Sequence, residues 1–398
     1  MLGTREQFLP QEEMLETAIS RKKMSIGLPR ENTLLEKRIA LIPSAVKTLV
    51  QHGQEIIIEK GAGEAAHFTD HAYSEAGALM AETPQEVYKA EVILKVAPIT
   101  HDEIGLLRDR QKLMSVLHLS HHNKEYFRKL ILKRVTAIAY ENIRDKTNAS
   151  PVVRSISEIA GTTSIQIAAE YLSHEKYGNG VMFGGFTGIA PSEVVILGAG
   201  TVGEYAARMA LGMGALVKIF DNSIYKLRQF QSRLHQTIFT STIQIPTLKT
   251  ALKTADVLIC AIHSNHHRSP IIVTEEMVAQ MKPGSVIVDV SIDQGGCVET
   301  SRMTTHNNPV FVMHGVTHYC VPNIASRVPQ TASIALSNFF EPLLLDAADM
   351  GGLDKLIESD YYFRQGVYLF NGILTNKNIG EFFDLPYQNI DLLMAAYH

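Results

Sequence analysis

His118 is a candidate for acid–base chemistry because it stands near the end of a strongly apolar run, Leu113–Leu119. Such a run predicts a buried strand, and ligands of open α/β sheets collect at the carboxyl ends of parallel strands. An imidazole titrates near neutral pH, so it can donate and accept protons there. The alternative is a surface or structural histidine, since the chain contains 16 histidines.

Two charged residues complete a candidate set for chemistry on a small acid. Asp293 lies where the apolar run around Asp289 enters a glycine-containing loop, so it is expected at the carboxyl end of another strand. Arg38 carries a guanidinium that can hold a carboxylate with two parallel hydrogen bonds. A structural role for Asp293 and a solvated position for Arg38 are the alternatives.

A glycine motif indicates a dinucleotide. An apolar strand, Val194–Leu197, leads into Gly198-Ala-Gly200-Thr201-Val202-Gly203, and a helical pattern follows. In that context the first glycine permits a tight turn and the second lets the backbone approach a diphosphate. The third glycine lets helix and strand pack closely. The diphosphate is then expected against the free N–H groups at the helix N-terminus.

The next strand pattern, Leu216–Phe220, ends at Asp221, about 18 residues beyond the last glycine. An acid there binds ribose hydroxyls and repels a 2′-phosphate, so the sequence predicts NAD rather than NADP. Lys226 and Arg228 follow a turn later and are the features that leave NADP open. The second glycine motif, Gly61-Ala-Gly63, lacks the matching strand and acid and is interpreted as a simple loop.

The elements that position these residues alternate between short apolar runs and helical patterns, which predicts α/β architecture with mostly parallel sheets. We expect two Rossmann-like domains linked by long helices near Ser157–His174 and Pro329–Asp349. Further strands are predicted at Ser25–Leu28, Ile56–Ile58, Val92–Val96, Met114–Leu119, Thr136–Tyr140, Val257–Ile262, Ser285–Val290 and Val310–Met313, and a helix at Pro43–Gly53. Whether the tail returns to the first domain stays open from pattern alone.

Composition excludes several classes of function. A net charge of −4 offers no basic field for nucleic acid or an anionic membrane, and the apolar runs are strand-sized.

The three cysteines, Cys260, Cys297 and Cys320, lack metal-type spacing and are expected as reduced thiols in a cytoplasm. Residues 1–23 lack the features of a signal peptide and are interpreted as a helical extension. Neither His118/His121/His122 nor His263/His266/His267 has zinc-site spacing, so no metal is predicted.

Several blocks together resemble the family of alanine dehydrogenases and nicotinamide nucleotide transhydrogenase α-subunits. They are Ile26-Gly-Leu-Pro29-Arg-Glu31, Arg38-Ile-Ala-Leu-Ile-Pro43, Leu117-His118-Leu119, Ser157-Glu158-Ile-Ala-Gly161, Gly198–Gly203, Asp289-Val-Ser-Ile-Asp293-Gln-Gly-Gly296 and His318-Tyr-Cys-Val-Pro-Asn323. The resemblance implies a discontinuous substrate domain, residues 24–151 and 330–398, around an NAD domain, residues 152–329. It also implies a homo-oligomer, commonly a hexamer.

The resemblance further implies conversion of L-alanine, NAD and water into pyruvate, ammonia and NADH. By position, His118 would be the acid–base residue and Asp293 its assistant, while Arg38 would bind the substrate carboxylate. Ser157, Asp221 and Asn323 would contact the cofactor, with Gly198, Gly200, Thr201, Val202 and Gly203 at its diphosphate.

Two departures bear on the substrate. The family reads Lys-Val-Lys-Glu-Pro where this chain has Lys95-Val-Ala97-Pro98, so the second lysine, which helps bind pyruvate, is replaced by alanine. Lys95 lies on the same strand face, roughly 6.6 Å back, and is the candidate substitute. The family's Pro-Gly-Ala-Lys loop is replaced within residues 261–270. A dehydrogenase of another small amino or oxo acid, and a non-catalytic or partner-dependent NAD-binding subunit, are therefore alternatives.

Overall fold

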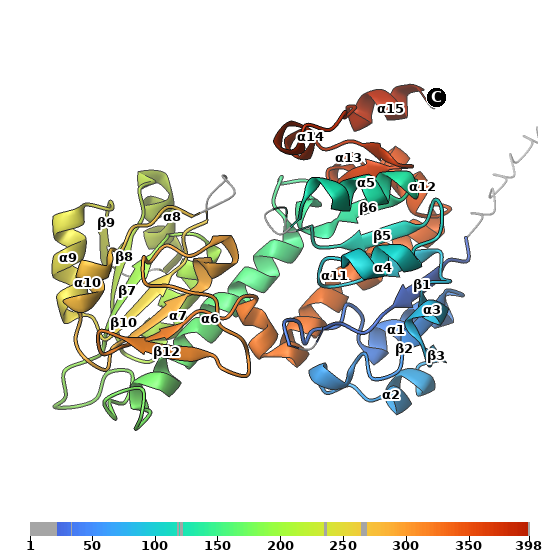
Figure 1. Cartoon of the computed structure of the whole chain (residues 1–398). Helices are drawn as coiled ribbons and strands as arrows, with labels where there is room; N and C mark the ends of the chain where they lie inside the picture. The colour runs from blue at the N-terminus through green and yellow to red at the C-terminus, as the bar shows by residue number, and fades with distance from the viewer. Residues whose placement is uncertain are drawn as a thin grey trace, which may run out of the picture.

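The computed structural model describes residues 22–32, 34–117, 119, 122–234, 237–263 and 269–396. Its strands form two sheets, eight strands in one and seven in the other, and helices cover both (Figure 1). The predicted α/β architecture with two mostly parallel sheets and long linking helices is confirmed. None of the helices in these residues is both long and apolar enough to cross a lipid bilayer.

The first sheet has the order β15-β14-β6-β5-β4-β1-β2-β3. Strands β1 to β6 pair with one another in parallel. Strands β14 and β15, from the C-terminal part of the chain, are added antiparallel at the β6 edge. The bounds are β1 Ser25–Leu28, β2 Glu55–Glu59, β3 Leu79–Ala81, β4 Val92–Leu94, β5 Lys112–Ser115, β6 Thr136–Ala139, β14 Val367–Phe370 and β15 Ile373–Leu374.

The second sheet has the order β12-β13-β11-β10-β7-β8-β9 and is parallel except for β12. The strand order reverses between β7 and β10, and such a switch point is where open α/β sheets bind ligands. The bounds are β7 Glu193–Leu197, β8 Leu216–Phe220, β9 Phe239–Ser241, β10 Val257–Cys260, β11 Val286–Asp289, β12 Val310–Met313 and β13 Val316–Tyr319.

The helices fill the connections between strands. The α-helices are α1 Pro43–Gln51, α2 Asp70–Glu75, α3 Pro84–Val87, α4 His101–Leu106, α5 Lys124–Leu132, α6 Pro151–Ser173, α7 Thr201–Gly212, α8 Ile224–Leu234, α9 Ile245–Thr254, α10 Glu275–Ala279, α11 Pro329–Asp349, α12 Leu353–Ser359, α13 Tyr361–Arg364, α14 Lys377–Phe383 and α15 Ile390–Ala396. Short 3₁₀ helices are η1 Glu64–Ala66, η3 Tyr140–Asn142, η4 Val290–Gln294 and η5 Ile324–Arg327.

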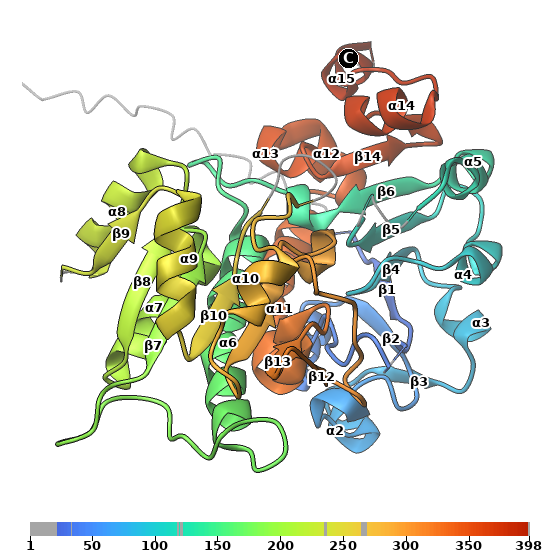
Figure 2. The same cartoon turned by 60° about the vertical axis from the view of Figure 1, so that its left-hand side comes forward.

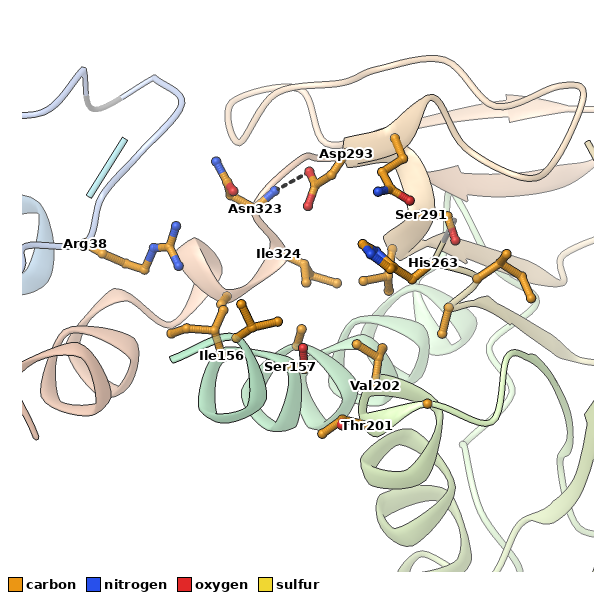
Figure 3. Close-up of a pocket in the computed structure, with 18 residues that line it drawn as sticks. Arg38, Ile156, Ser157, Thr201, Val202, His263, Ser291, Asp293, Asn323 and Ile324 are labelled. Atoms are coloured by element: carbon orange, nitrogen blue, oxygen red, sulfur yellow. Dashed lines mark hydrogen bonds between the residues drawn. The ribbon is translucent and has the colours of Figure 1, made fainter. Parts of the chain in front are cut away.

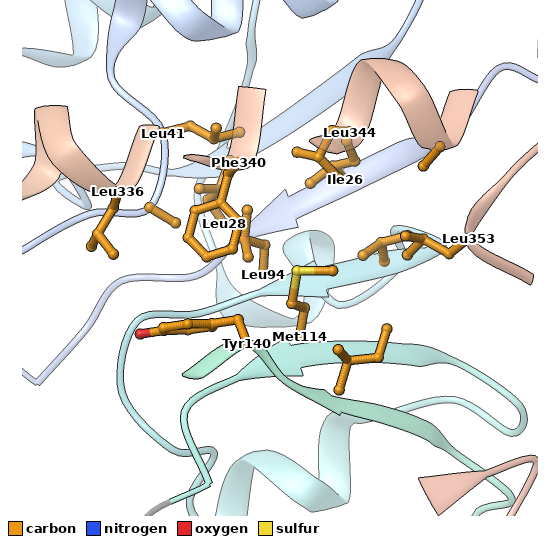
Figure 4. Packing of buried hydrophobic residues seen from close by; sticks show 14 of the residues in the cluster. Ile26, Leu28, Leu41, Leu94, Met114, Tyr140, Leu336, Phe340, Leu344 and Leu353 are labelled. Carbon is orange, nitrogen blue, oxygen red and sulfur yellow. The ribbon is translucent and has the colours of Figure 1, made fainter. Parts of the chain in front are cut away.

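Both faces of the central strands are covered, so these strands are apolar throughout rather than alternating. In the first sheet, Leu28, Leu94 and Met114 pack against Phe340 and other apolar residues of α11 (Figure 4). Burial of such side chains contributes roughly 1.5–3 kcal/mol each relative to exposure. The first-sheet core therefore fixes α11. The segment just before this helix, residues 323–325, lines the cavity described below.

Helices α6 and α11 pass between the two sheets (Figures 1 and 2). Val152 at the start of α6 belongs to the first-sheet core, whereas Ala160 through Leu172 pack in the second. The predicted start of this helix, Ser157, is wrong: α6 begins at Pro151. Proline at the first helical position, after Ser150, is the signal that the apolar spacing alone missed.

Two strands of the first sheet end earlier than predicted. β4 ends at Leu94 rather than Val96, because the Val96 N–H donates to the Glu31 carboxylate at 2.7 Å. β5 ends at Ser115 rather than Leu119, and the Leu117 N–H donates to the Glu141 carboxylate at 2.7 Å. In both places a backbone N–H donates to a side-chain carboxylate instead of to a neighbouring strand. The chain can therefore leave the sheet while it is still buried.

Candidate active site

A cavity of about 340 Å³ lies at the carboxyl ends of the second-sheet strands and reaches Arg38 beside the first sheet (Figure 3). It falls in the usual size range of small-molecule sites. The lining residues are Arg38, Val153, Ile156, Ser157, Ala160, Gly200, Thr201, Val202, Ala261, Ile262, His263, Val290, Ser291, Asp293, Gln294, Asn323, Ile324 and Ala325. The cavity thus brings together Arg38, Asp293, Ser157, Asn323 and part of the glycine motif.

The glycine loop has the geometry that a diphosphate requires. A Cβ on Gly203 would lie 1.9 Å from the Gly198 carbonyl oxygen, so only glycine allows this contact between helix and loop. Gly198 has φ +107°, which glycine adopts without strain. A Cβ on Gly200, in contrast, would meet no protein atom within 4 Å, because its Cα faces the cavity. The open position at Gly200, at the N-terminus of α7, therefore fits a bound diphosphate.

Asp221 directly follows β8 and is buried, but it is absent from the cavity lining. One carboxylate oxygen accepts the Ala199 N–H at 2.8 Å and the other accepts the Ser223 N–H at 2.7 Å. The carboxylate thus braces the glycine loop from the neighbouring strand. Each oxygen keeps a second lone pair, so this role is compatible with ribose recognition.

Arg38 is held in place by Glu36. Its Nε and Nη2 atoms donate to the two Glu36 carboxylate oxygens at 2.7 and 2.5 Å, and both residues are buried. Burial alone would raise the pKa of Glu36, but the adjacent guanidinium outweighs burial and lowers that pKa. The pair is therefore ionised, and the buried guanidinium presents a fixed positive charge at the cavity wall. Arg38 is not the solvated surface residue of the alternative interpretation.

Asp293 and Asn323 both line the cavity, and a hydrogen bond joins them. The Asn323 N–H donates to the Asp293 carboxylate at 3.0 Å (Figure 3). Asn323 has φ +53°, a left-handed conformation that asparagine tolerates better than most residues. This conformation turns the chain from β13 into η5 and places the side chains of both residues at the cavity.

Asp289 supports the segment that carries Asp293. Its carboxylate accepts the N–H groups of Ser291 at 3.0 Å and Cys297 at 3.2 Å and the Ser301 hydroxyl at 2.7 Å. Burial raises the pKa of Asp289 to about 6, and these donors oppose that rise. These contacts give Asp289 a structural role.

Lys95 is buried and is absent from the cavity lining. Its ammonium lies 2.5 Å from Glu103 and 3.4 Å from Glu31. Burial alone would lower the pKa of Lys95, but the two carboxylates outweigh burial and raise that pKa. Burial raises the pKa of Glu31 to about 7, although Lys95 opposes this. The lysine that was the candidate substitute for the missing family residue is thus already paired within the protein.

Some predicted residues do not line the cavity or are not described. Gly198 and Gly203 do not line the cavity but allow the close contact between helix and loop behind it. His118 lies outside the described residues, as do His121, His266 and His267. The second glycine motif does not reach the cavity. A Cβ on Gly63 would be 2.5 Å from the Tyr73 ring, so that glycine serves packing.

Sequence reasoning missed three cavity residues that follow the strands, Ser291, Gln294 and His263. Their signal was position: each stands within a few residues of the carboxyl end of β10 or β11. It also missed Glu36, Glu31 and Glu103, whose roles depend on long-range pairing that no local pattern encodes.

Within the described residues, donor atoms of Cys260, Asp289 and Cys297 lie within 4.8 Å of one another. Both thiols are buried, and burial raises the pKa of Cys260 well above its usual value, which favours the protonated thiol. The Asp289 oxygens already accept three hydrogen bonds. We interpret the group as structural.

Fold and site together define a two-domain α/β protein with a dinucleotide-type glycine loop and a buried arginine in one cavity. Models of the alanine dehydrogenase/PNT N-terminal and C-terminal domains match residues 27–160 and 164–377. The chain belongs to the alanine dehydrogenase/PNT family, and this membership with the glycine loop indicates a nicotinamide cofactor.

Named relatives cover nearly the whole chain. It is 38% identical to alanine dehydrogenase of Mycolicibacterium smegmatis over 94% of this chain and 100% of the relative. It is 39% identical to alanine dehydrogenase of Bacillus subtilis over 92% and 96%. A solved L-alanine dehydrogenase structure superposes with a TM-score of 0.83 at 38% identity, covering 91% and 99%. A transhydrogenase from Sinorhizobium meliloti, at 22% identity and TM-score 0.75, shares the fold.

Proposed function

We propose that this protein is an NAD-dependent alanine dehydrogenase. The reaction converts L-alanine, NAD⁺ and water into pyruvate, ammonium, NADH and a proton. The proposal rests on one cavity that is lined by Arg38, by Asp293 and by the open glycine loop. Arg38 is ion-paired with Glu36. Relatives named alanine dehydrogenase at 36–39% identity support the same activity.

In this proposal Arg38 binds the substrate carboxylate with its fixed guanidinium, because an ionised pair in a buried wall needs no reorganisation when the anion arrives. A nicotinamide dinucleotide held at the glycine loop would supply the acceptor for the hydride that leaves the α-carbon of alanine. Asp293, whose carboxylate accepts the Asn323 N–H, is proposed to stabilise the positive charge of the imine nitrogen. His118 is proposed as the acid–base residue that moves protons during hydration of the imine, on the basis of the family resemblance.

The choice of NAD over NADP rests on Asp221, whose buried carboxylate would oppose a 2′-phosphate. Ser157 and Asn323 are proposed as further cofactor contacts because both line the cavity. We also propose a discontinuous substrate domain, residues 24–151 and 330–398, around an NAD domain, residues 152–329. A cytoplasmic homo-oligomer, a hexamer by resemblance, completes the proposal. The three described cysteines are unpaired thiols, which is consistent with a reducing compartment.

A dehydrogenase acting on another small oxo acid is the second candidate. It is favoured by one observation: Ala97 offers no amine, and Lys95 is bound to Glu103 and Glu31. The lysine contact to pyruvate is then missing unless substrate binding releases Lys95 from its partners.

The test is NADH oxidation by the purified protein with ammonium and a panel of 2-oxo acids that includes pyruvate, with NADPH in parallel. The proposal predicts the highest kcat/KM with pyruvate and NADH, and loss of turnover in His118→Ala and Asp293→Asn. His71→Ala, an exposed histidine on α2, is the matched control. A larger oxo acid as best substrate supports the second candidate, and NADH binding without turnover on any acid contradicts both.

A further inference from the structure

The segment after β10 packs directly against the glycine loop. The Ala261 N–H donates to the Leu197 carbonyl at 2.7 Å. A Cβ on Gly198 would lie 2.3 Å from the Ala261 carbonyl oxygen and 3.2 Å from the Ile262 nitrogen. The backbone of residues 261 and 262 therefore touches the loop at its first glycine. This packing places the next residue, His263, in the lining of the cavity.

The imidazole of His263 is exposed to the cavity and lines it together with Gly200, Thr201 and Val202. In the view of Figure 3 the ring lies on one side of the cavity, while Ser157, Thr201 and Val202 lie on the other. Gly200, where a Cβ would meet no protein atom within 4 Å, lines the same cavity. An anion bound at the α7 N-terminus would thus have backbone N–H groups on one side and this ring on the other.

The surroundings of His263 favour the neutral form of its imidazole. Burial and, after it, the nearby Lys226 ammonium lower the pKa of His263. Lys226 lies in the first turn of α8, close behind Asp221. At neutral pH the imidazole is then neutral and keeps one N–H to donate, and the Lys226 ammonium lies near enough to affect its pKa. A dianionic diphosphate is the part of a dinucleotide that such a pair would recognise.

We propose that His263 is a cofactor-binding residue that donates an imidazole N–H to a diphosphate oxygen, closing the anion site opposite the glycine loop. The inference rests on the proposed use of a nicotinamide dinucleotide and adds the residue that completes the diphosphate site. It also gives a purpose to one residue of the segment in which this chain departs from the family's usual loop.

The experiment measures dissociation constants of NADH and ADP-ribose by titration, and of adenosine by NMR, for the full-length protein and three variants. His263→Leu keeps a similar size without the N–H, His263→Gln keeps a donor, and His71→Leu is the control. We expect His263→Leu to weaken NADH and ADP-ribose about tenfold. Adenosine should change less than about twofold, and His263→Gln should recover most of the loss with an unchanged melting temperature.

Equal binding of NADH and ADP-ribose by wild type and His263→Leu overturns the inference, as does an equal loss for adenosine. Failure of the wild type to bind either NADH or ADP-ribose contradicts the proposed function itself. That outcome is distinct, because the inference is tested on a wild type that binds both.

Discussion

The wall of the cavity at Arg38 is built from paired charges, whereas the wall at the glycine loop is built from backbone. At Arg38 the guanidinium is fixed in place by hydrogen bonds to Glu36, and the Lys95 ammonium is likewise held by Glu103 and Glu31. Gly200 itself contributes only backbone, and the site is the space left where a Cβ is missing at the N-terminus of α7. One side thus offers an anion a fixed side-chain charge, whereas the other offers backbone N–H groups at a helix N-terminus.

The largest expected effect tests the backbone side. In Gly203→Ala the new Cβ would lie 1.9 Å from the Gly198 carbonyl oxygen, so helix α7 or the loop must move. We expect a loss of about 3 kcal/mol in stability and at least about 100-fold in NADH affinity. Calorimetry and NADH titration measure these.

Gly200→Ala is the matched variant, since φ is −82° and no protein atom lies within 4 Å of its Cβ. It should melt at the wild-type temperature yet bind NADH about tenfold more weakly, because the methyl group enters the cavity. A wild-type affinity in Gly203→Ala, or an unfolded Gly200→Ala, would contradict the assignment of the two glycines.

Arg38→Lys tests the charged side and is expected to have the next largest effect. Lysine keeps the charge but loses the planar fork that Glu36 orients, so the KM for the oxo acid should rise about 30-fold. NADH affinity should stay unchanged, because the glycine loop makes no use of Arg38. Steady-state kinetics beside NADH titration separates the two. Parallel losses of substrate and cofactor would mean that the two walls do not act independently.

Glu31→Gln is expected to have the smallest effect on substrate and cofactor binding, and it tests how the buried charges are stabilised. Burial raises the pKa of Glu31 from 4.5 to about 7 in the folded protein. Its contribution to stability is therefore fully present below pH 4.5 and is lost as pH rises through about 7, because the unfolded chain releases that proton more readily.

The glutamine variant lacks this dependence. Its stability relative to wild type should increase by about 3 kcal/mol between pH 4.5 and 7. Denaturant unfolding at several pH values measures the difference, with the exposed Glu64→Gln as control. A difference that stays flat with pH would show that Glu31 is ionised in the folded protein throughout this range.

The two sides also differ in how far the sequence predicts them. The glycine loop was predicted with its strand and helix, because its geometry follows from local residue types; α11 was predicted with the bounds observed. Arg38 was a candidate, but its partner Glu36 and the network around Lys95 depend on distant segments meeting in space. The start of α6 was missed because apolar spacing says little about helix caps, and residues 261–263 reach the cavity through packing on Gly198.

The most direct test of the account follows hydrogen from cofactor to product. The protein is incubated with pyruvate, ammonium and NADH that carries deuterium in both positions at C4 of the nicotinamide ring, and the product is examined by NMR and mass spectrometry. The account predicts L-alanine with one deuterium at the α-carbon, because substrate and cofactor meet in one cavity between Arg38 and Gly200. Alanine without deuterium, or no alanine while NADH binds, would contradict it.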